Sequence, residues 1–181
     1  MLTWLFRNRL RAVERTWDYD MSYARALLEA DAKAFMAFAK VQGMTRYRKS
    51  IPRDAYYAAK IAGTVAEDCG PCTQLIITMG LREGMDPKVL SAIVRGDEAS
   101  LTEEVRIGMR FARAVIAHAS EADELRDQIV ARWGAPALAS LAFAVTMARV
   151  YPTLKYALGY GKACQRVVVA GTPITVLREA A

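Results

Sequence analysis

The sequence is poor in the residues that bind metals and in those that build disulfide frameworks. Its 181 residues include three cysteines and one histidine, His118. Three cysteines, of which Cys164 lies far from the other two, do not make the framework of a small secreted protein. A zinc site at the other two cysteines, Cys69 and Cys72, would need Cys164 and His118 as further ligands. Neither lies near that pair in sequence, and the two are not spaced as a second pair of zinc ligands. We therefore predict a cytoplasmic protein without a metal or another cofactor.

Long apolar runs and alternating strand patterns are also missing. No window approaches 18 uninterrupted apolar residues, so no membrane span is expected. The largely apolar residues 1–6 precede the first arginine, which is the reverse of the order in a signal peptide. With 54% apolar and 24% charged residues, the composition is that of a globular protein, and the length predicts one domain. Without a strand pattern, the sequence favours an all-α fold.

Positive charge is concentrated near the start of the chain. The formal net charge is +6, and the first fifty residues hold ten basic and five acidic side chains. A modest basic excess is a weak sign of nucleic-acid binding, and no known nucleic-acid motif accompanies it. We therefore predict no nucleic-acid partner.

Residues 2–17 have the pattern of an amphipathic helix. Apolar side chains such as Leu5, Leu10 and Trp17 form one stripe, and arginines lie opposite. Such a helix packs on its own domain or on a partner subunit. The alternative is a basic helix that lies on an anionic membrane surface.

Helical spacing and helix-ending residues divide the whole chain into helices. An N-terminal extension, residues 1–49, holds a helix over 3–17 and a helical run over 21–47 that breaks near Gly43. Residues 50–181 form one compact helical domain. Its expected helices are 50–66 with Ser50 as N-cap, 70–82 ended by Gly84, 86–94 ended by Gly96, 100–115 opened by a capping box, 120–133 ended by Gly134, and 135–161 kinked at Pro152. The β-branched residues 166–169 are expected to form an ordered arm or an edge.

The candidate chemistry lies at Cys69 and Cys72, at the start of one predicted helix. A helix N-terminus presents unpaired N–H groups and the positive end of a dipole, so it favours a thiolate over a thiol. Pro71 fits the first helical turn, and Gly70 lets a substrate approach the backbone closely. With Cys69 as N-cap, Cys72 takes the third helical position, within disulfide reach after a small adjustment. The pattern indicates a dithiol that cycles to a disulfide; the alternatives are a zinc site or two inert buried cysteines.

The order of elements around this motif resembles the carboxymuconolactone decarboxylase-like superfamily, and most closely its alkylhydroperoxidase D-like branch. The resemblance covers roughly residues 50–161, including the segment Glu67–Gly84, the helix after Asp86-Pro87, the helix start Leu101–Glu104 and the long final helix. It implies a helical bundle that forms homo-oligomers and buries the dithiol at an interface or cleft. It also implies a small peroxide or disulfide substrate, and a dithiol reductant protein or small thiol that re-reduces the pair.

The chain departs from this family pattern at two positions. The family places a histidine four residues after the second cysteine, where this chain has Ile76, and a glutamate about three turns before the first, where it has Tyr56-Tyr57-Ala58. Those groups deprotonate the attacking thiol and protonate the leaving oxygen. The candidates to replace them are Tyr57, as a hydrogen-bond donor, and Glu67 and Asp68, which lie nearest in sequence.

The two patterns disagree about which sulfur attacks. The family pattern assigns attack to Cys72, whereas helix electrostatics and accessibility favour Cys69 as the more exposed nucleophile. We expect Cys69 to attack in disulfide exchange with Cys72 resolving, and leave the order open for peroxide chemistry. The chain is thus predicted to be a homo-oligomeric dithiol oxidoreductase. The alternatives are a redox-responsive or structural oligomer, and a lactone decarboxylase, against which the retention of both cysteines argues.

Overall fold

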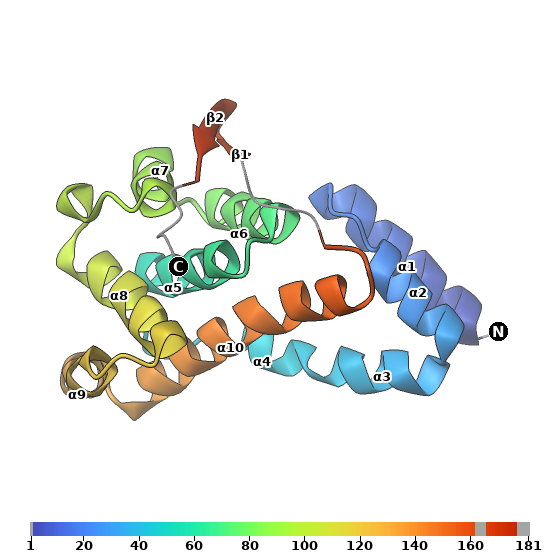
Figure 1. Ribbon diagram of the computed structural model, residues 1–181, viewed down its shortest axis with the longest axis horizontal. Helices are drawn as coiled ribbons and strands as arrows, with labels where there is room; N and C mark the ends of the chain where they lie inside the picture. Colours follow the sequence, from blue (N-terminus) through green and yellow to red (C-terminus); the bar gives the residue numbers. More distant parts are fainter. Residues whose placement is uncertain (1, 162–165, 177–181) are drawn as a thin grey trace.

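The computed structural model describes residues 2–161 and 166–176, which are α-helical apart from one short hairpin (Figure 1). The elements follow in the order α1 (Leu2–Trp17), α2 (Ser22–Ala30), α3 (Ala32–Lys40), α4 (Gln42–Arg46), α5 (Arg53–Ala66), α6 (Gly70–Arg82), α7 (Pro87–Arg95), η1 (Glu98–Ser100), α8 (Glu103–Ala117), α9 (Glu121–Trp133), α10 (Ala135–Ala157), β1 (Arg166–Val169) and β2 (Thr172–Thr175). The prediction of an all-α fold class is confirmed.

Helix α5 is the centre of the core. Every residue from Ala55 to Thr64 is buried, which is the property of a helix enclosed on all sides. It packs against α6, α8 and α10. Small residues make two of these contacts close: a Cβ on Gly108 would overlap the backbone of Ala55, and a Cβ on Gly63 would lie 2.6 Å from that of Ala148.

The N-terminal helices form a second apolar cluster beside this core. Its buried members are Leu10, Tyr19, Met21, Tyr23, Ala24, Leu28 and Phe35. Leu75 of α6 and Tyr151 and Leu154 of α10 pack against them. Figure 1 shows α1 and α2 side by side at one edge of the molecule, next to the ends of α6 and α10. This packing brings the connection between α1 and α2 to the start of α6.

The helical run predicted over residues 21–47 is interrupted at two places, and Gly43 is neither of them. Asp31 has an extended backbone with φ −160° and ψ 120°, and its carboxylate accepts a hydrogen bond from the N–H of Lys33 (2.8 Å). Val41 separates α3 from α4, and Gly43 lies inside α4. The predicted break near Gly43 is confirmed at Val41, two residues earlier. The break at Asp31 was not predicted, and it arises because a capping aspartate competes with the helix.

Most of the predicted helix ends are confirmed. Gly84, Gly96 and Gly134 stand at the ends of α6, α7 and α9 with φ values of 80°, 68° and 83°. Positive φ carries no steric penalty for glycine, so these residues end helices readily. Asp86 is the N-cap of α7, and its carboxylate accepts from the N–H of Lys88 (2.8 Å).

Two predicted helix starts are wrong in detail. Ser50 has a φ of 61°, and Pro52 takes the N-cap position of α5 instead. Thr102 is the N-cap of α8, while the hydroxyl of Ser100 donates to Asp97 (2.6 Å). The pattern that resembles a capping box is therefore used for a local turn before the helix.

The hairpin of β1 and β2 covers one side of α6 and α7. The strands are antiparallel with Val167 opposite Ile174, and both side chains are buried. Residues 170–171 have φ values of 47° and 83°, as in the tight turns that suit a right-handed strand twist. The side-chain amide of Gln74 donates to the carbonyl of Val168 (3.0 Å) and accepts from its N–H (2.7 Å). The prediction of an edge at residues 166–169 is confirmed by β1, whereas β2 was not predicted from the sequence.

Among the described residues, only α10 is long and apolar enough to cross a membrane by length and composition. This is a weak sign of a membrane span, because core helices of folded domains pass the same test. Helix α10 packs against α4, α5, α8 and α9, and 44% of its apolar window is buried within the protein. It ends at Ala157 rather than at the predicted residue 161, and Pro152 lies inside it.

Gly108→Ala is expected to lower the free energy of unfolding by about 3 kcal/mol. Its methyl group would press on the backbone of Ala55, which cannot move aside as a side chain does. Gly43→Ala is the control, because a Cβ there meets nothing within 4 Å; it should be neutral or stabilising by up to about 1 kcal/mol. Urea denaturation measures both values. Equal stability of the two variants would contradict the close packing of α5 on α8.

Candidate active site

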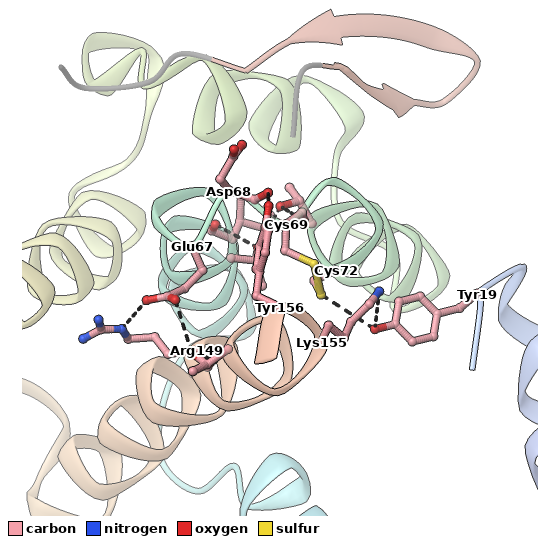
Figure 2. The surroundings of a disulfide bond; sticks show 12 residues. Tyr19, Glu67, Asp68, Cys69, Cys72, Arg149, Lys155 and Tyr156 are labelled. Atoms are coloured by element: carbon pink, nitrogen blue, oxygen red, sulfur yellow. Dashed lines mark hydrogen bonds and ion pairs between the residues drawn. A yellow bond between two sulfur atoms is a disulfide. The ribbon is translucent and has the colours of Figure 1, made fainter. Parts of the chain in front are cut away.

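The cysteine pair lies at the turn between α5 and α6 (Figure 2). Asp68 reverses the chain with a φ of 51°. Cys69 is the N-cap of α6 and Gly70 begins the helix, so Cys72 occupies the third helical position as predicted. The two cysteines form a disulfide, and their Cα atoms are 5.3 Å apart.

Two buried threonines hold the first turn of α6 against α5. The hydroxyl of Thr73 lies 3.1 Å from the hydroxyl of Thr64 and 3.0 Å from the carbonyl oxygen of Cys69. Thr73 and Thr64 are 0% and 2% exposed, so these contacts are shielded from water. The cysteines therefore lie on a rigid part of the fold rather than on a loose loop.

The two sulfurs differ in their access to solvent. Cys69 is 0% exposed and lies within the protein, whereas Cys72 is 4% exposed and lines a cavity. The expectation that Cys69 is the more exposed sulfur is wrong. As the N-cap, Cys69 faces the α5–α6 turn, while the third helical position turns Cys72 towards the space between α6, α10 and the N-terminal helices.

Tyr19 and Lys155 lie next to the sulfur of Cys72 (Figure 2). The Tyr19 hydroxyl is 3.7 Å from Cys72 Sγ, and it donates because a disulfide sulfur carries no hydrogen. Lys155 Nζ donates to the Tyr19 oxygen (3.5 Å) and lies 4.8 Å from the centre of the Tyr19 ring. Lys155 is only 2% exposed, so its charge acts in a poorly hydrated environment. Burial also raises the pKa of Tyr19 above its ordinary value, which keeps the hydroxyl protonated as a donor.

The cavity that reaches Cys72 has a volume of about 650 Å³. Helices α1, α4, α5, α6 and α10 and the α1–α2 connection all contribute to its wall. Most of the wall is apolar or aromatic, and the charged side chains in it are Arg46, Arg48, Lys60 and Glu83. This size lies within the range of small-molecule binding sites in proteins.

Lys60 is the most deeply buried of these charged groups. It is 8% exposed, and its Nζ lies 5.2 Å and 5.6 Å from the ring centres of Tyr56 and Tyr57. Burial lowers the pKa of Lys60 to about 8, against the opposing attraction of the Glu83 carboxylate. The ammonium is therefore stabilised by the attraction of Glu83 and by two aromatic faces, which attract cations.

Tyr57 belongs to a polar group at the end of the cavity opposite the sulfur. Its hydroxyl donates to Glu83 (2.6 Å), and the guanidinium of Arg48 donates to the other carboxylate oxygen (2.5 Å). Burial opposes the ionisation of Glu83, but these two hydrogen bonds outweigh it and hold the pKa of Glu83 below its ordinary value. Burial raises the pKa of Tyr57, so the phenol stays protonated. Tyr57 thus lines the same cavity as Cys72 without sharing its hydrogen bonds.

The two carboxylates nearest in sequence point away from the sulfurs (Figure 2). Glu67 accepts from Nε of Arg149 (2.5 Å) and from the hydroxyl of Thr153 (3.3 Å). The backbone oxygen of Asp68 accepts from the hydroxyl of Tyr156 (3.0 Å). Both residues hold the turn before α6 against α10, and neither lines the cavity.

The other candidate ligands and thiols lie elsewhere. His118, expected to be an ordinary residue of its helix, is the exposed C-cap of α8 with a φ of 54°. Cys164 falls outside the described residues. Within the part of the chain that the structure describes, no group of three or more His, Cys, Asp or Glu side chains is arranged to hold a metal ion.

The resemblance to the alkylhydroperoxidase D-like branch is carried by the sequence pattern alone. No protein-family model matches the chain, and neither does any curated protein or solved structure. The resemblance therefore stays a prediction, and what this site can do follows from its residues.

Sequence reasoning missed Tyr19, Lys60 and Lys155. Lys60 left a local signal, because it is the only charged residue between Ala55 and Ala66. A lone lysine in a run that is otherwise uncharged indicates a buried charge with a specific environment. Tyr19 and Lys155 left no such signal, since Tyr19 meets Cys72 across 53 residues and Lys155 meets Tyr19 across 136.

The pKa of Lys60 predicts how stability depends on pH. Its folded value of about 8 lies below the ordinary 10.5, so between these values the unfolded chain binds more protons than the folded chain. The free energy of unfolding should rise between about pH 8 and pH 10, by about 2 kcal/mol more in the wild type than in Lys60→Met. Urea denaturation at each pH measures this difference. Parallel pH profiles for the two proteins would contradict the burial of a charged Lys60.

Proposed function

We propose that the protein is a dithiol oxidoreductase in which Cys72 is the reactive sulfur and Cys69 the resolving one. The main support is the position of Cys72 Sγ, which lines the cavity beside the hydroxyl of Tyr19, itself contacted by the buried Lys155. A disulfide kept only for stability needs neither a cavity at one sulfur nor a buried cation near it. The proposed substrates are peroxides or disulfides small enough to enter the cavity.

In the reduced protein, three features would stabilise a thiolate at Cys72. The Tyr19 hydroxyl donates to the sulfur, Lys155 donates to the Tyr19 oxygen, and the N-terminus of α6 presents the positive end of its dipole. Tyr19 and Lys155 thus supply the polar support that the family pattern assigns to a histidine and a glutamate. Ile76 and Tyr57, at those two positions, leave the role vacant.

With a hydroperoxide, the Cys72 thiolate attacks the terminal oxygen, forms an S–O bond and breaks the O–O bond. The alkoxide that leaves takes up a proton relayed through Tyr19, and Cys72 becomes a sulfenic acid. The thiol of Cys69 then attacks this sulfur, the S–S bond forms and water leaves. An external dithiol returns the pair to the reduced state with two electrons. With a disulfide substrate, the same thiolate forms a mixed disulfide that Cys69 resolves.

Peroxide consumption with a dithiol reductant tests the roles of the two sulfurs. Cys72→Ser should abolish turnover, because it removes the attacking sulfur. Cys69→Ser should react once and stop as a sulfenic acid that dimedone traps, since no resolving thiol remains. Cys164→Ser is the control and should keep wild-type turnover. If dimedone labels Cys69 in Cys72→Ser, the assigned order of attack is reversed.

The support of the thiolate by Tyr19 is measurable as a thiol pKa. Tyr19→Phe in the reduced protein should raise the pKa of Cys72 by about one unit, because the thiolate loses its nearest donor. The rate of alkylation by iodoacetamide as a function of pH reports this value. Tyr56→Phe is a matched control, because its hydroxyl donates to the carbonyl of Thr45. Equal thiol pKa values in the wild type and Tyr19→Phe would contradict the proposed stabilisation of the Cys72 thiolate by Tyr19.

We also propose that the protein forms a homo-oligomer, as the resemblance implies. The support is the exposure of Trp4 and Leu5 on α1, which are 64% and 50% accessible in the single chain. Large apolar side chains that stand together on a surface are typical of protein contacts.

Light scattering coupled to size exclusion should therefore give a mass that is a multiple of 20.0 kDa. The double variant Trp4→Glu, Leu5→Glu should shift this mass towards the single chain. A monomeric wild type would contradict the oligomer and would leave the chemistry at Cys72 unaffected.

A further inference from the structure

One end of the cavity holds a buried ammonium with aromatic neighbours and no carboxylate in direct contact. Lys60 lines the cavity and is buried, with a relative exposure of 8%. Within the described residues, its Nζ has no carboxylate within ion-pair distance, and its contacts are the rings of Tyr56 and Tyr57. A buried charge is costly unless an opposite charge or hydrogen bonds compensate it. The Lys60 ammonium therefore has room for an anion in direct contact, in addition to the more distant attraction of Glu83.

Glu83 attracts Lys60 without forming an ion pair with it. It is the only carboxylate that the described residues contribute to the cavity wall, and its two oxygens are taken by Tyr57 and Arg48. Arg46 lines the cavity as well. Three cations therefore line a cavity whose one carboxylate is already engaged, and such an excess attracts an anionic ligand.

The rest of the cavity wall suits an apolar chain. Between the charged end and the sulfur, the wall is formed by Leu75, Ile76 and Met79 of α6 and by Met147, Ala148, Tyr151 and Pro152 of α10. Glu83 follows Cys72 by eleven residues, which at 1.5 Å per residue is about 16 Å along α6. The cavity is thus elongated, with a cationic end and a sulfur end.

We propose that this cavity binds an elongated amphipathic carboxylic acid, with its carboxylate at Lys60 and its apolar chain directed along α6 towards Cys72. This inference rests on the proposed function: the acid is a substrate whose reducible peroxide or disulfide group lies at the other end of the molecule from the carboxylate. The ammonium of Lys60 pairs with the carboxylate inside the cavity. Ile76, which stands where the family pattern has a histidine, then forms part of the apolar wall that contacts the chain of the acid.

Binding is measured without turnover, on the oxidised protein, by titration calorimetry with decanoate and with decan-1-ol below their aggregation limits. The wild type should bind decanoate about tenfold or more tightly than the alcohol, because only the acid carries a charge for Lys60. Lys60→Met should lose this preference and keep the wild-type affinity for decan-1-ol, which also shows that the cavity is intact. Lys88→Met, an exposed lysine on α7, is the matched control and should bind as the wild type does.

Equal affinity for acid and alcohol in the wild type would overturn the proposal, as would a Lys60→Met variant that still prefers decanoate. The double variant Cys69→Ser, Cys72→Ser, which has no redox chemistry, should bind decanoate as the wild type does. If the proposed redox function is wrong, the preference for decanoate over the alcohol should still be measured. If the carboxylate site is wrong, peroxide turnover should still be measured.

Discussion

The burial of α5 on every side is the constraint on which the rest of the structure depends. Gly63 and Gly108 let α10 and α8 approach to backbone contact, so α5 keeps no face towards solvent. Each polar side chain on such a helix must then face another polar group or an internal space. Tyr57, Lys60 and Thr64 lie on the side that faces α6 and α10, and all three line the cavity. The same packing that closes the core thus concentrates the polar groups of α5 at one site.

Aromatic rings stabilise the two buried lysines in a similar way at opposite ends of the site. Lys155 lies over the rings of Tyr19 and Tyr23, at 4.8 Å and 5.5 Å, and Lys60 lies over those of Tyr56 and Tyr57. A ring face attracts a cation, but it does not neutralise the charge as a carboxylate does. Each lysine thus lies beside the group it is proposed to act on, a thiolate at one end and an anionic ligand at the other. Loss of either pair of rings would raise the cost of burying the lysine.

Local patterns predicted the helices and the placement of the cysteines well. The apolar spacing, the glycines at helix ends and the Cys69-Gly70-Pro71-Cys72 turn act over a few residues, and the structure agrees with them. The exposure of the sulfurs was predicted wrongly, because it depends on how α10 and the N-terminal helices cover the turn. Tyr19 and Lys155 were missed for the same reason: only the tertiary packing brings them to Cys72. Lys60 was detectable, but its partners and the cavity around it were not.

The side-chain amide of Gln74 has a consequence for the hairpin. By donating to the carbonyl of Val168 and accepting from its N–H, it occupies both backbone groups that β1 would otherwise present to solvent at that position. An edge strand with free backbone groups is a template on which a strand of another molecule can add. A glutamine from α6 here acts as the terminal rung of a two-stranded ladder. It protects the exposed edge from intermolecular strand pairing, a task that most proteins give to charged side chains or prolines.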